Sequence, residues 1–202
     1  MPSGRKSRKK QVHKKRIDSK LKISGVAGII NLSLFVPSLT LSVMKSLKYL
    51  HEILFPLHIL MNILLIITTI LFLRGFVIIG ERVKNFFLII ASYTLIVANI
   101  VANSIFIGFD LMGITWSPEN LPFTWLVILT LLFVGVVNIF FGLGLLQLRN
   151  KFGDIATATG ILEIIAGVSS CSIILFFFDI ILTIPVMILE VIIIFRACEI
   201  LQ

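Results

Sequence analysis

The chain has few of the residues from which enzymes build their sites. Its 202 residues include only 10 Asp and Glu, 3 His and 2 Cys. The two cysteines, Cys171 within an apolar block and Cys198 beyond the last one, do not suit a disulfide framework. The sequence also contains no G-x-S-x-G elbow, histidine box, H-E-x-x-H pair or Walker A loop. We therefore expect no cofactor, no metal site and no enzymatic activity.

The chain also lacks the polar surface of a soluble domain. Hydrophobic residues make up 58% of it, above the roughly 45–50% that is usual, and they occur in long blocks. A bilayer core about 30 Å thick needs roughly 20 apolar residues in a helix. The blocks are residues 23–44, 53–73, 86–109, 123–148, 155–178 and 180–195. They predict an all-α, polytopic transmembrane bundle of about six helices over residues 23–202, with a tight hairpin near Asp179.

The distribution of positive charge predicts the orientation of this bundle. Lysine and arginine concentrate in cytoplasmic loops, and with the N-terminus inside, only Lys45 and Lys48 of the 18 Lys and Arg residues fall outside. If the first block lay on the membrane surface instead, six cations of later loops would move outside. A cleavable signal peptide fits poorly, since no A-x-A-like site follows the block. We expect a multi-pass protein of the cell membrane with both termini cytoplasmic.

Residues 1–22 form a strongly basic tail, in which Asp18 is the one acidic residue. We expect this cytoplasmic tail to be disordered and to contact anionic lipid headgroups, each nearby cation contributing about 1 kcal/mol. The predicted lipid contacts are Arg5, Lys6, Arg8, Lys9, Lys10, Lys14, Lys15 and Arg16. A nucleic acid or an acidic protein is an alternative partner. No aromatic residue interleaves the cations, which disfavours stacking on single-stranded nucleic acid.

Small and polar residues recur at helical spacing inside the apolar blocks. Such stripes mark helix–helix contacts in membranes. The stripes are Ser24, Gly28, Asn31, Ser38 and Ser42; Ser92, Asn99 and Asn103; Gly135, Asn138 and Gly142; and Gly160, Glu163, Gly167 and Ser170. Contact between helices is the first interpretation of these side chains. The second is a polar pathway or ligand site, for which Asn99, Asn103 and Asn138 are candidates.

Glu163 and Glu190 are the sharpest candidates for a functional site. A carboxylate inside a membrane helix costs about 2.5–3.5 kcal/mol on insertion scales, so it needs a partner or a function. With a hairpin at Asp179, Glu163 lies level with Arg196. A Glu163–Arg196 ion pair with Glu190 nearby is therefore the first expectation. A proton relay or cation site, and snorkelling of both glutamates to the surface, are the alternatives.

One histidine and two prolines inside the apolar blocks give two further predictions. His58 lies one turn before Asn62, and we expect its ring to bond to that amide or to the backbone. Pro56 and Pro185 are expected inside the second and sixth helices, where proline produces kinks.

Three hypotheses for function follow, and they differ in one observable. The first is a non-enzymatic scaffold that assembles with a membrane protein partner or with copies of itself. The second is a small transporter or channel that uses Glu163 and Glu190. The third is a membrane enzyme. A conduit requires a cavity that reaches the glutamates or asparagines, whereas a scaffold should have these groups paired and dry.

Overall fold

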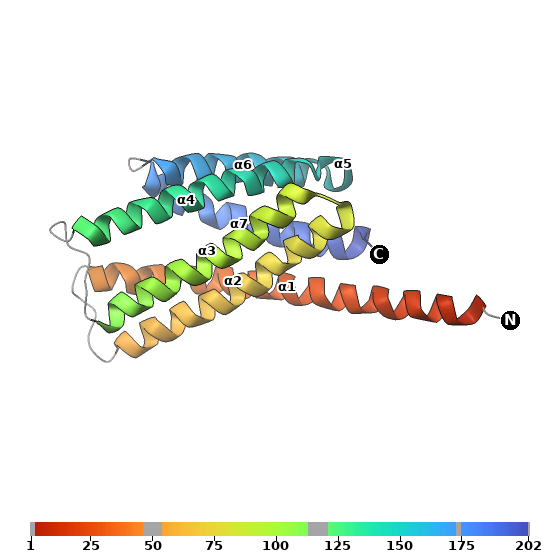
Figure 1. Ribbon diagram of the computed structural model, residues 1–202, viewed down its shortest axis with the longest axis horizontal. Coiled ribbons are helices and arrows are strands. Elements are labelled where there is room, and N and C mark those ends of the chain that lie inside the picture. The colour runs from red at the N-terminus through yellow and green to blue at the C-terminus, as the bar shows by residue number, and fades with distance from the viewer. Residues whose placement is uncertain (1–2, 47–53, 113–120, 173–174, 202) are drawn as a thin grey trace.

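The computed structural model describes residues 3–46, 54–112, 121–172 and 175–201, which are almost entirely helical. In chain order the helices are α1 (Ser3–Ser46), α2 (Phe55–Val83), α3 (Phe86–Leu111), α4 (Leu121–Leu146), α5 (Arg149–Phe152), α6 (Asp154–Cys171) and α7 (Phe176–Ile200) (Figure 1). No β-strand occurs within these ranges. The prediction of an all-α fold is confirmed.

Within the described ranges, six helices are long and apolar enough to cross a membrane. The candidate spans are Asp18–Lys45, Phe55–Val83, Phe86–Leu111, Thr124–Leu146, Asp154–Cys171 and Phe178–Ile200. They match the six predicted blocks, and together they give the fold of a multi-pass membrane protein. Figure 1 shows both chain termini at the same end of the bundle. We call this the terminal end, and the end where α1 finishes and α2 begins the far end.

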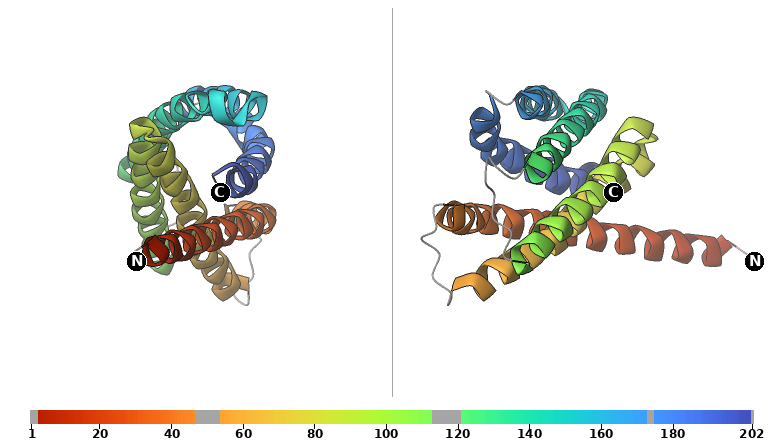
Figure 2. Two further views of the ribbon diagram at one scale, coloured as in Figure 1. Left: turned by 90° about the vertical axis from the view of Figure 1, so that its right-hand side faces the viewer. Right: turned by 60° about the vertical axis from the view of Figure 1, so that its left-hand side comes forward.

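The six long helices form a closed ring in which each contacts its two neighbours. The contacts run from α1 to α2, α3, α4, α6 and α7, and α7 returns to α1. A view along the bundle shows this ring (Figure 2). Contacts are most extensive between α4 and α6 and between α1 and α2. We call α1–α3 the first half of the ring and α4–α7 the second half.

Helix α1 differs from its prediction at the N-terminus. It begins at Ser3, so the basic segment continues the membrane helix where a disordered tail was expected. No glycine or proline lies between Arg5 and Ser24, and lysine and arginine are good helix formers. A membrane helix already supplies the nucleus from which this segment extends. The side chains from Arg5 to Arg16 lie outside the described residues, so their lipid contacts stay a prediction.

The hairpin between the last two helices also differs from its prediction. α6 ends at Cys171 and α7 begins at Phe176, so the turn precedes Asp179 instead of containing it. Asp179 lies in the first turn of α7, where a carboxylate is favoured by the helix dipole, and it accepts a 2.6 Å hydrogen bond from Ser170 Oγ. α7 then runs past Arg196 to Ile200, which gives the sixth crossing its full length.

Glycines bring α4 and α6 into close contact, as the small-residue stripes predicted. A Cβ atom added at Gly142 would lie 2.7 Å from the carbonyl oxygen of Gly160, and one at Gly135 would lie 2.7 Å from that of Gly167. The obstacle in each case is the backbone of the neighbouring helix. These two pairs fix α4 and α6 at a distance that larger residues would not permit.

The prolines occupy different places in their helices. Pro56 lies in the first turn of α2, where its missing N–H is tolerated, so the expected kink inside that helix is wrong. Pro185 lies inside α7, as predicted, and Pro37 lies inside α1.

The buried apolar core lies in the terminal half of the bundle. Its centre is an aromatic cluster in which Phe76 packs edge-to-face on Phe72 and on Phe141, with centroid distances of 5.5 and 5.1 Å. Fully buried aliphatic side chains surround it: Ile79, Leu88, Leu145, Ile193 and Ile194. In the far half, by contrast, every described residue of α3 from Tyr93 onward and of α4 up to Val134 is at least partly exposed. The apolar core therefore closes the terminal end of the bundle, whereas α3 and α4 bury little of their surface toward the far end.

Candidate functional site

A cavity of about 350 Å³ lies inside the ring, next to the aromatic cluster. All six long helices contribute side chains to it. Its polar lining residues are Asn31 of α1, Thr69 of α2, Asn99 and Asn103 of α3, Asn138 of α4, Glu163 of α6, and Thr183 and Glu190 of α7. The apolar lining includes Phe72 and Phe141 from the aromatic cluster. We call this cavity the chamber. The aromatic cluster borders it on the side of the terminal end.

Five of the six residues predicted from the sequence for an intramembrane site line this one cavity. They are Asn99, Asn103, Asn138, Glu163 and Glu190. Arg196 does not line it and is exposed. It follows Glu190 by six residues, and at about 100° per residue that places it about 120° away around α7. Among the described residues no ion pair joins Arg196 to Glu163, so the expected pairing is wrong.

Glu163 is instead paired with Glu190. The two side chains are 7% and 5% exposed, and their carboxyl groups lie within hydrogen-bonding reach of each other. An ionised carboxylate only accepts hydrogen bonds, so a bond between two carboxyl groups requires a proton on one of them. A proton shared by the two carboxyl groups would remove their mutual repulsion, and the pair would then carry one negative charge.

Asp179 is a third acidic residue near this pair. It lies in the first turn of α7 and accepts a hydrogen bond from Ser170 of α6, the helix that carries Glu163. Lysine and arginine make no ion pair with any of the three acids within the described part of the chain. A membrane site with several acids and no bound arginine or lysine favours a cation or a proton as its occupant.

The amides around the carboxyl pair leave hydrogen-bonding capacity unused. Asn31 Nδ2 donates to Thr69 Oγ1, and Asn103 Nδ2 donates to the backbone oxygen of Asn99 at 2.9 Å. Asn99 Oδ1, however, is buried and has no hydrogen-bond partner among the described residues. A buried acceptor without a partner costs about 1–3 kcal/mol, so its position on the wall of a polar cavity points to a ligand or to water.

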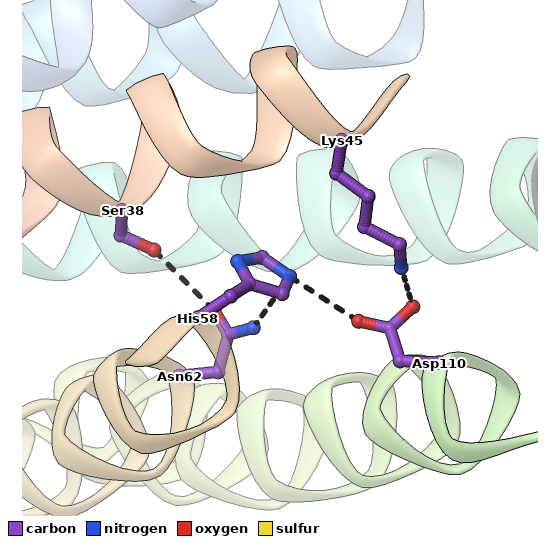
Figure 3. A network of polar contacts seen from close by, with 5 residues as sticks. All are labelled: Ser38, Lys45, His58, Asn62 and Asp110. Carbon is purple, nitrogen blue, oxygen red and sulfur yellow. Dashed lines mark hydrogen bonds and ion pairs between the residues drawn. The ribbon is translucent and has the colours of Figure 1, made fainter. Parts of the chain in front are cut away.

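A second polar network joins α1, α2 and α3 near the far end of the bundle (Figure 3). Asp110 accepts a hydrogen bond from Lys45 Nζ, and its other oxygen lies 3.2 Å from Nε2 of His58. That nitrogen also lies 3.2 Å from Nδ2 of Asn62, whose oxygen accepts from Ser38 Oγ at 3.3 Å. Nε2 can donate to the carboxylate or accept from the amide, but one ring state does not allow both. The expected contact of His58 with Asn62 is confirmed.

Sequence reasoning missed several of these residues. Asn31 was on a predicted stripe but was not selected for the site. Thr69 and Thr183 carried no signal, because threonine in a helix commonly bonds to its own backbone, as Thr183 does with the carbonyl oxygen of Asp179 at 2.9 Å. The contact between Lys45 and Asp110 spans 65 positions, and nothing in the local sequence around either residue indicates it.

Within the described ranges, no group of three or more His, Cys, Asp or Glu side chains is placed to hold a metal ion. The cavity instead offers the carboxyl oxygens of Glu163 and Glu190 and the amide groups of its asparagines. Comparisons with models of protein families, with curated proteins and with solved structures found no match to this chain.

Proposed function

We propose that this protein is a small membrane transporter that binds a cationic solute at the carboxyl pair of Glu163 and Glu190. The observation that carries the proposal is the chamber itself, which receives polar side chains from all six membrane helices. Two buried acids without a basic partner need a reason in a membrane. A cation that takes the place of the shared proton provides one.

The arrangement of the core supports a carrier. The chamber is closed toward the terminal end by Phe72, Phe76 and Phe141, while α3 and α4 bury little of their surface on its other side. A carrier is closed at one end in each of its two states. Pro185, two residues from Thr183 in the chamber wall, removes a backbone hydrogen bond from α7 and gives that helix a place to bend.

The scaffold hypothesis is the second candidate, and the glycine contacts of α4 and α6 favour it. Those contacts show a bundle that is assembled through small residues, as a structural membrane protein would be. A scaffold does not, however, account for an amide oxygen left without a partner beside two acids. We therefore place transport first.

The test is charge movement by the reconstituted protein. Proteoliposomes of phosphatidylcholine and phosphatidylglycerol are adsorbed on a solid-supported membrane and exposed to tetramethylammonium, guanidinium or K⁺ jumps. We expect a transient current with at least one cation, reduced by about tenfold or more in Glu163→Gln and in Glu190→Gln, since tenfold corresponds to only 1.4 kcal/mol of lost interaction. A glutamine amide can donate to the remaining carboxylate in place of the shared proton, so both variants should fold.

Glu199→Gln is the matched control, because Glu199 lies on the same helix as Glu190 but is exposed and does not line the chamber. It should keep the wild-type current. Currents that equal those of empty liposomes for all three cations, or full currents in both glutamine variants, would refute the proposal.

A further inference from the structure

A second hollow, of about 290 Å³, lies on the outside of the ring between α3 and α4. Much of its lining is exposed on the lipid-facing surface, with Val97, Val101, Leu129 and Phe133 each more than half exposed. Its two hydroxyl groups are already bonded within their own helices, Thr94 to the carbonyl oxygen of Ile90 and Thr130 to that of Leu126. The groove therefore presents hydrocarbon to the bilayer.

The groove and the chamber share a wall. Ala98 and Ala102 of α3 and Val134 of α4 line both hollows. The two spaces thus lie on either side of the contact between α3 and α4, separated there by small side chains. This contact is one of those that join the first half of the ring to the second.

The two hollows differ sharply in chemistry. The chamber holds the carboxyl pair and four asparagines, whereas the groove is lined by aliphatic and aromatic groups. An apolar cavity of about 150 Å³ accommodates benzene. By that scale the groove accepts a hydrocarbon chain of roughly ten carbon atoms. A molecule that fits both hollows therefore has a cationic head, which suits the chamber, and a single alkyl chain, which suits the groove.

We propose that the transported solute is a cationic amphiphile, an alkylammonium compound that enters from the bilayer between α3 and α4. This inference rests on the proposed transport function and names its substrate class. The head binds at Glu163 and Glu190, the chain lies along Val97, Val101 and Phe133, and the shared wall at Ala98 and Ala102 yields to let the two meet. The chain never leaves an apolar environment, so entry requires dehydration of the head alone.

The test compares two cations with the same head in the proteoliposome assay. Decyltrimethylammonium, below its micellar concentration, should reach half-maximal current at a concentration about tenfold or more below that of tetramethylammonium. Ala102→Phe fills the shared wall and should bring the two half-maximal concentrations to within about twofold of each other, whatever its effect on the size of the currents. Val136→Phe adds the same ring to an exposed position of α4 outside both hollows and should preserve the preference.

A measurement on the unaltered chain keeps the inference testable if Ala102→Phe fails to fold. Decyltrimethylammonium with a diazirine at the end of its chain should label residues 94–105 or 129–134, and excess unlabelled compound should prevent this, whereas decanesulfonate should not. Equal half-maximal concentrations for the two cations, or labelling spread evenly over the lipid-facing surface, would overturn the amphiphile inference and leave transport standing. Loss of all cation currents would overturn both.

Discussion

Replacing Gly142 by alanine tests whether close packing of α4 on α6 shapes the site. The added Cβ would lie 2.7 Å from the carbonyl oxygen of Gly160 and 3.1 Å from Cβ of Glu163, whereas ordinary contact begins at 3.4 Å. The helices must therefore separate by several tenths of an ångström, because backbone cannot rotate away as a side chain can. Overpacking of this kind costs about 1–3 kcal/mol, and it displaces Glu163 from Glu190.

Replacing Gly160, the partner of Gly142, by alanine tests the same contact from the other helix. A Cβ at Gly160 would lie 2.8 Å from the carbonyl oxygen of Gly142, so one separation of the helices relieves both clashes. We expect the double variant to lose less stability than the sum of the single variants, by about 0.5 kcal/mol or more. The assay is unfolding by sodium dodecyl sulfate in mixed micelles, followed by circular dichroism.

Gly108 provides the control for this experiment. It lies in α3 and a Cβ there would meet nothing within 4 Å, so Gly108→Ala should be neutral or stabilising by up to about 1 kcal/mol, the helix preference of alanine over glycine. Two results would contradict this reasoning: a Gly142→Ala variant as stable as Gly108→Ala, or stability losses of Gly142→Ala and Gly160→Ala that add fully in the double variant. Either would show that the close contact of these glycines does not hold α4 against α6.

Three other predictions address the site, the far-end network and the orientation. Asn99→Leu removes a buried acceptor that has no partner, so it should raise the free energy of unfolding by up to about 1–3 kcal/mol yet weaken the cation current; a large loss of stability would instead identify the amide as structural. Asp110→Asn leaves Lys45 and His58 without their carboxylate and should destabilise the bundle by about 1–2 kcal/mol, less than for a fully buried pair, with much of the loss recovered when Lys45→Met is added; no recovery would contradict the pairing. A single cysteine at Met112, in a chain with Cys171 and Cys198 replaced, should react with an impermeant thiol reagent on intact cells, and failure to react would contradict the predicted orientation.

The sequence was sufficient for the number of membrane helices and for most residues of the chamber. Both follow from short-range rules, namely the length of apolar segments and the 3.6-residue period that places Gly135, Asn138 and Gly142 on one face. Polar side chains in a bilayer avoid lipid, so the helices turn their asparagines and glutamates inward. This is why residues chosen for polarity alone arrive in one cavity.

The partner of Glu163 could not be predicted, because it depends on where the last hairpin turns. A lone carboxylate between two apolar runs indicated a turn at Asp179, but α6 already ends at Cys171, and Asp179 lies in the first turn of α7, where it accepts a hydrogen bond from Ser170. Shifting a hairpin by a few residues changes which side chains lie level and rotates the faces that meet. Arg196 was thereby replaced by Glu190 as the neighbour of Glu163.

The polar residues of the chamber are divided between the two halves of the ring. Glu163 and Glu190 both belong to the second half, whose α4 and α6 are held together by the glycine pairs, whereas Asn31 and Asn99 belong to the first. The halves also meet closely at Gly28 of α1, where a Cβ would lie 2.7 Å from a side-chain atom of Val191 of α7. In the proposed transport cycle, the chamber can open toward the terminal end only if α1 separates from α7 at this contact and the aromatic cluster also separates. Under the proposed transport function, a cation bound between the acids of one half and the amides of the other strengthens the attraction between the halves and thereby biases this movement.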